Sequence, residues 1–190
     1  MNNLFTKVAL AASMAVISFG AAAESASFQA GVAVQNAFTM TKDADLDFGT
    51  IRAKADSTNA ATLILPADPN ANSSTPAATD AEISILVPGT PASFSVSGVS
   101  PFATLTITDP SPADITPDAA PPGTPGFDLG TYTYYLVSGG ASAGSVTDIQ
   151  VDANGEATFN LGATLSTETV AGSYIDGTYS GTFTLQLDYP

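Results

Sequence analysis

The chain has 190 residues and a formal net charge of −14, with 18 acidic residues against 4 basic ones and with no His, Cys or Trp. A surface this acidic disfavours nucleic acid and anionic membranes, because it lacks the cations that displace phosphate counterions. The lack of His and Cys excludes Ser-His-Asp and Cys-His catalytic sites as well as disulfides, so we expect a protein without catalytic activity that is stabilised by packing.

Residues 1–23 have the layout of a secretory signal peptide. Lys7 supplies a positive charge, residues 8–19 are mostly apolar, and Ala21-Ala22-Ala23 fits a cleavage site. No later stretch approaches the roughly 20 consecutive apolar residues that a transmembrane helix needs. We therefore predict export through the inner membrane to the periplasm, and then to the cell surface or medium, with residues 24–190 forming one domain.

Residues 24–35 alternate between apolar and polar side chains, which predicts a strand close to the start of the mature protein. The apolar face of this strand consists of Ala26, Phe28, Ala30, Val32 and Val34. Phe38 and Met40 continue the pattern after a slip near Asn36.

Short strands separated by turns follow along the rest of the chain. They are predicted over residues 43–51, 61–66, 82–87, 94–99, 104–108, 131–137, 146–151, 157–161 and 163–165. Residues 109–126 contain six prolines and are predicted to form a surface loop. Asn154-Gly155 predicts a type I′ hairpin turn between the strands at 146–151 and 157–161.

Two acidic clusters raise the question of calcium, which prefers carboxylate and carbonyl oxygens. Neither cluster has the layout of an EF-hand loop. We interpret the first as a charged strand edge that discourages wrong pairing and the second as an ordinary turn, and we expect no metal and no cofactor. The candidate ligands are Asp43, Asp45 and Asp47 in the first cluster and Asp152, Asn154 and Glu156 in the second.

The final stretch, from Tyr179, has apolar or aromatic residues at most odd positions and polar residues at the even ones. This period of two predicts a strand with one buried face. With eight to ten short strands and no helical periodicity after the signal peptide, the sequence predicts an all-β fold, a single β-sandwich.

Four stretches resemble a family of exported bacterial proteins known as domain of unknown function 4402. They are Leu46-Asp47-Phe48-Gly49-Thr50-Ile51, Phe94-Ser95-Val96-Ser97-Gly98, Leu161-Gly162-Ala163-Thr164-Leu165 and Gly177-Thr178-Tyr179-Ser180-Gly181-Thr182-Phe183. Their order and spacing extend over essentially the whole of residues 24–190, but the family name carries no function.

The end of the chain also resembles the C-terminus of fimbrial subunits of the chaperone–usher class. Gly177 is the fourteenth residue from the end and Tyr189 the second, and Phe48-Gly49 is similar to a motif of the archaic, spore-coat-U-like members. This resemblance implies a single immunoglobulin-like β-sandwich that is left incomplete and a periplasmic chaperone and usher as partners. It also implies a groove wall formed by Phe183, Leu185, Leu187 and Tyr189.

The resemblance further implies that the apolar face of residues 24–35 is a donor strand for a neighbouring copy, giving a head-to-tail polymer. The expected function is then that of a structural subunit of a surface fimbria or filament. In the alternative, residues 24–35 complete the protein's own sandwich, and the protein is a secreted binding module for a glycan, calcium or a surface. We expect no nucleic-acid partner in either case.

Overall fold

The computed structural model describes residues 27, 29, 31 and 37–189. The chain divides into two units, Met1–Val34 and Gln35–Pro190, and the fold described below is that of the second unit. The predicted signal peptide and the five apolar positions of the predicted first strand lie outside the described residues.

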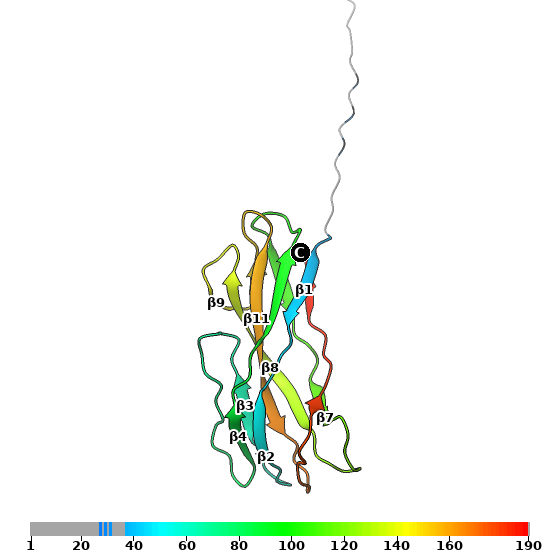
Figure 1. Ribbon diagram of the computed structural model, residues 1–190. Coiled ribbons are helices and arrows are strands. Elements are labelled where there is room, and N and C mark those ends of the chain that lie inside the picture. The colour runs from blue at the N-terminus through cyan, green and yellow to red at the C-terminus, as the bar shows by residue number, and fades with distance from the viewer. Residues whose placement is uncertain (1–26, 28, 30, 32–36, 190) are drawn as a thin grey trace, which may run out of the picture. The chain divides into compact units, whose positions relative to one another are not determined.

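The described residues are all-β, and their strands curl into a sandwich-like arrangement, as the alternating sequence predicts (Figure 1). The largest sheet has the order β1-β5-β11-β8-β7-β12, with β3 paired to β11 and β9 to β8. Its strands are β1 (Thr39–Ala44), β3 (Thr62–Leu65), β5 (Ala92–Ser97), β7 (Ala113–Pro117), β8 (Phe127–Ser138), β9 (Gly144–Val146), β11 (Ala157–Thr167) and β12 (Tyr179–Ser180).

Two smaller sheets complete the fold. One has the order β10-β6-β13 and the other pairs β2 with β4, and every pairing in the three sheets is antiparallel. Their strands are β2 (Thr50–Lys54), β4 (Glu82–Val87), β6 (Thr104–Thr108), β10 (Asp148–Gln150) and β13 (Gln186–Asp188).

The apolar side chains gather into two core clusters that share β8 and β11. The first is built around Phe159 and includes side chains of β5, β6, β10 and β13, with the Phe94 and Phe159 rings stacked at a centroid distance of 5.3 Å. The second lies between β3, β4 and the other halves of β8 and β11, and contains Leu63 and Ile83. Half-buried Leu46, Tyr132 and Phe183 pack against both clusters, so they join the two cores.

Strand β11 is the centre of the large sheet, and it corrects the prediction of two short strands at 157–161 and 163–165. One edge of β11 pairs with β8 throughout, while the other pairs first with β5 and then with β3. Gly162 lies between the part of β11 that pairs with β5 and the part that pairs with β3. A Cβ at this position would lie 2.4 Å from the backbone oxygen of Leu65. Gly162, which lies between the two predicted strands, is needed for the close approach of β3.

The Pro-rich segment 109–126, predicted to be a surface loop, contains strand β7. Ala113 pairs with Leu129, and Ile115 pairs with Phe127. Proline is tolerated here because Pro112 precedes the strand and Pro117 ends it, so neither removes a ladder hydrogen bond from its middle.

The predicted hairpin around Asn154-Gly155 is also corrected. Its two strands belong to different sheets, because β10 pairs with β6 whereas β11 pairs with β5. Gly155 has a φ of 77°, but Asn154 does not have positive φ, which excludes a type I′ turn. The turn connects the two layers of the sandwich instead of two neighbouring strands.

Candidate interaction edge

Strands β1 and β13 are the outermost strands of their sheets. Among the described residues, β1 pairs only with β5 and β13 only with β6. The outward-facing backbone groups of both strands therefore have no ladder partner within residues 37–189. An unpaired row of N–H and C=O groups is a template for an added strand.

The two edges border the same core. Phe38, which precedes β1, and Met40, within it, pack against the first cluster, as does Tyr189. Leu185 and Leu187 belong to that cluster. Figure 1 shows the start of β1 and the end of the chain at the same end of the sandwich. We call these two strands, with the side chains named here and Phe183, the open edge.

The side chains of the final strand follow the predicted alternation. Leu185 and Leu187 are each 8% exposed, and Phe183 and Tyr189 are half-buried, while Thr184, Gln186 and Asp188 are exposed. The half-buried aromatic groups leave apolar surface uncovered at an edge where backbone groups are also unpaired. This combination is suited to an apolar, extended chain segment.

The backbone of the final stretch is not one continuous strand, although the alternation predicts one. Its first part, β12, pairs with β7, its second part, β13, pairs with β6, and residues 181–185 between them join no ladder. The break arises because β6 and β7, with which the stretch pairs, belong to different sheets.

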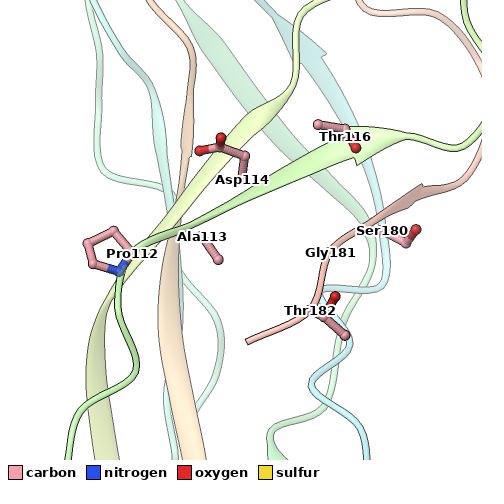
Figure 2. A pocket seen from close by; sticks show the side chains of 7 residues that line it. All are labelled: Pro112, Ala113, Asp114, Thr116, Ser180, Gly181 and Thr182. Atoms are coloured by element: carbon pink, nitrogen blue, oxygen red, sulfur yellow. The ribbon is translucent and has the colours of Figure 1, made fainter. Parts of the chain in front are cut away.

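A shallow, open pocket lies where β7 and the final stretch separate (Figure 2). Its walls carry hydroxyl groups and one carboxylate, and Gly181 is held close to β7, since a Cβ there would lie 2.5 Å from the backbone oxygen of Asp114. The lining residues are Pro112, Ala113, Asp114, Thr116, Ser180, Gly181 and Thr182. The pocket offers no pair of groups for acid–base or nucleophilic chemistry.

Two tyrosines of β8 hold the segment that connects β6 and β7. The Tyr134 hydroxyl donates to Asp109 Oδ1 at 2.8 Å, and the Tyr132 hydroxyl donates to the Ser111 carbonyl at 3.3 Å. Burial, and then the hydrogen bond to Asp109, raise the pKa of Tyr134, so the hydroxyl remains a donor. Tyr132 also contacts Phe183, with ring centroids 5.9 Å apart. This contact connects the tyrosines of β8 to the final stretch.

The first acidic cluster is distributed among local partners. Asp43 accepts a hydrogen bond from Ser95 Oγ at 2.6 Å, and Asp45 forms an ion pair with Lys42. Asp47 Oδ1 accepts from the Gly49 N–H at 2.7 Å. These interactions fix the edge of β1 and the turn before β2.

The second acidic cluster forms the turn between β10 and β11. Asp152 Oδ1 accepts from the backbone N–H groups of Asn154 at 2.8 Å and Glu156 at 3.0 Å. These donors, with that of Glu156 first, hold the pKa of Asp152 below its ordinary value. Within the part of the chain that the structure describes, no three His, Cys, Asp or Glu side chains gather into a group suited to a metal ion.

Of the remaining predicted interaction residues, Gly177 lies in an exposed turn before β12 rather than in either edge strand. Sequence reasoning did not identify Phe38 and Met40 as part of the same edge as the C-terminal strand. Alternation places a residue on a face of its own strand, but it carries no information about which other strand lies nearby.

Comparison with known proteins places the chain in a family. Residues 38–189 match the family described as domain of unknown function (DUF4402), and the chain belongs to that family. No curated protein matches the chain. Among residues 27, 29, 31 and 37–189, no helix is long and apolar enough to cross a membrane.

Proposed function

We propose that this protein is a structural subunit of a surface fimbria or filament, assembled when a strand from one copy is added to the open edge of the next. The observation that carries the proposal is the coincidence of two unpaired strand edges, β1 and β13, on one apolar cluster. Strand addition at such a site gains backbone hydrogen bonds for affinity and side-chain pockets for register.

The segment that would be donated is residues 24–35. Its alternate apolar positions match the chemistry of the open edge, because an inserted strand presents every second side chain to the core. In this proposal Ala26, Phe28, Ala30, Val32 and Val34 enter the neighbouring copy. Leu185, Leu187 and Tyr189 form one wall of the site that receives them.

Export to the periplasm, recognition of the open edge by a chaperone and delivery by an usher belong to the same proposal. They are supported by the signal-peptide layout of residues 1–23 and by the similarity of the final stretch to fimbrial subunits. A periplasmic chaperone would protect the open edge until the donor strand replaces it, since an uncovered apolar edge promotes aggregation. Catalysis has no part in this proposal.

The test compares purified residues 24–190 with a version that lacks residues 24–35, to which the missing segment is added as a peptide. We expect the truncated protein to unfold at low temperature and the peptide to restore a cooperative transition at a higher one. A peptide with Val32→Asp, on the apolar face, is expected to fail, whereas one with Gln29→Asp, on the polar face, is expected to act.

The oligomeric state of the full mature chain distinguishes exchange between copies from closure within one copy. Ladders of oligomers in size-exclusion chromatography support the filament subunit. A stable monomer at high concentration means that residues 24–35 complete the protein's own sandwich, and the secreted binding module then replaces the filament subunit.

A further inference from the structure

Phe102 is an exposed aromatic residue whose backbone has an unfavourable conformation. It is 61% exposed, and its φ is 60°. Positive φ is uncommon outside glycine and is a genuine outlier for a bulky residue. Such outliers persist where the surrounding structure fixes them, and they concentrate at functional positions.

The loop that carries Phe102 is fixed on both sides. The Ala103 N–H donates to the Ser100 carbonyl at 3.1 Å, which closes a turn with Pro101 and Phe102 as its central residues. Proline followed by positive φ is the arrangement of a type II turn, in which glycine is favoured at the position of Phe102. The Phe102 N–H also donates to the Asp152 carbonyl at 3.1 Å, so the turn is tied to the loop before β11.

This loop lies beside Phe38 and Thr39, where β1 begins. Ser97, the last residue of β5, pairs with Thr39, the first residue of β1. A Cβ on Gly98 would lie 3.9 Å from the Cα of Phe38. Since residues 24–36 are covalently attached just before β1, any copy that receives them is held close to the loop of residues 98–103.

We propose that Phe102 packs against the neighbouring copy that receives the N-terminal segment, and so forms a contact between subunits outside the donor strand. This inference rests on the proposed function. The occupant is a second copy of this chain because, in the proposed function, that copy receives residues 24–35, and the loop lies next to Phe38, close to where this segment is attached in sequence. An exposed aromatic residue on a rigid turn suits this role, since large, preordered side chains carry much of the binding at interfaces.

The test uses Phe102→Gly in the full mature chain, with Leu86→Ser as the matched control. Leu86 is 63% exposed and lies on β4, in the separate two-stranded sheet. We expect Phe102→Gly to reduce the fraction of protein in long oligomers about fivefold or more, measured by light scattering after size-exclusion chromatography. The control is expected to assemble like the unsubstituted protein.

The same substitution in the protein lacking residues 24–35 separates an interface role from a structural one. Glycine relieves the unfavourable φ, so peptide binding is expected to stay within about twofold and the melting temperature is not expected to fall. If Phe102→Gly lowers both, or if its polymers are as long as those of the unsubstituted chain, the inference is wrong. Phe102→Asn, which also tolerates positive φ, repeats the test should the glycine variant fold poorly.

The two proposals fail in different ways. A full-length chain that stays monomeric, together with a peptide that does not bind, overturns the filament function and this inference with it. Polymers that require residues 24–35 but do not depend on Phe102 overturn this inference alone.

Discussion

Gly49 and Gly89 lie where two segments of backbone cross before β2 and after β4. Asp47 and Thr90 form a bridge at this crossing, with N–O distances of 3.0 and 2.7 Å. A Cβ on Gly49 would lie 2.2 Å from the Val87 oxygen, and one on Gly89 would lie 2.0 Å from the Asp47 oxygen. The Phe48-Gly49 pair thus has a local packing role, whatever the function of the family.

Substitution of Gly49 by Ala is expected to destabilise the protein by more than about 2 kcal/mol, because the methyl group meets fixed backbone. Gly123 is the matched control. Its φ of 85° is similar to the 77° of Gly49, but a Cβ there meets nothing within 4 Å. Gly123→Ala should therefore cost only about 1–2 kcal/mol. If urea unfolding shows that the two substitutions lower the free energy of unfolding equally, the crossing is not tightly packed.

Asp152 provides a pH-dependent contribution from a single turn. Its pKa is lowered from 3.8 in the folded protein, so its stabilising effect is fully present above that value and is lost as the pH falls through the folded pKa. We expect Asp152→Asn to lower the melting temperature at pH 6, and the difference from the unsubstituted protein to disappear in strongly acidic solution. A difference that is constant with pH would assign the effect to shape instead of charge.

At the scale of the strand, the sequence predicted local elements better than their partners. The bounds of β4 and β6 agree with the predicted strands, since each is a compact alternating run between turns. The predicted strands at 157–161 and 163–165 meet at Gly162, inside β11, and the prolines of residues 109–126 obscure β7. The open edge depends on which strands are outermost, and a period of two does not encode that property.

The pairing of β7 with β8 places two like charges opposite each other. Asp114 and Asp128 are register partners on neighbouring strands, and both are exposed. Like charges in this position are destabilising. We expect Asp128→Thr to stabilise the protein by about 0.2–1 kcal/mol, more at low salt than at high salt.

Asp148 is the matched control for this pair, because its register partner is the neutral Thr106. Asp148→Thr should change the free energy of unfolding by no more than about 0.5 kcal/mol. If the two substitutions stabilise the protein equally, the benefit comes from lower net charge in general and not from the cross-strand pair.

At the scale of the whole molecule, the acidic composition works against the proposed assembly. The formal net charge is −14, and Lys7 is the only charged side chain among residues 1–23, so residues 24–190 are more acidic still. Copies brought end to end repel one another at low ionic strength. The attraction between them must then come from backbone pairing and apolar burial, which salt does not screen.

Salt should therefore promote polymerisation of residues 24–190. Raising the ionic strength from about 0.01 M to about 0.15 M shortens the Debye length from about 30 Å to about 8 Å, and we expect assembly to become about tenfold faster or more. Binding of the 24–35 peptide to the truncated protein is the internal control, since Glu24 is its only charged side chain and its binding should change little. Light scattering measures the rate of assembly, and fluorescence anisotropy of a labelled peptide measures peptide binding. Slower assembly in salt would mean that ion pairs between copies drive it, contrary to an edge completed by apolar strand addition.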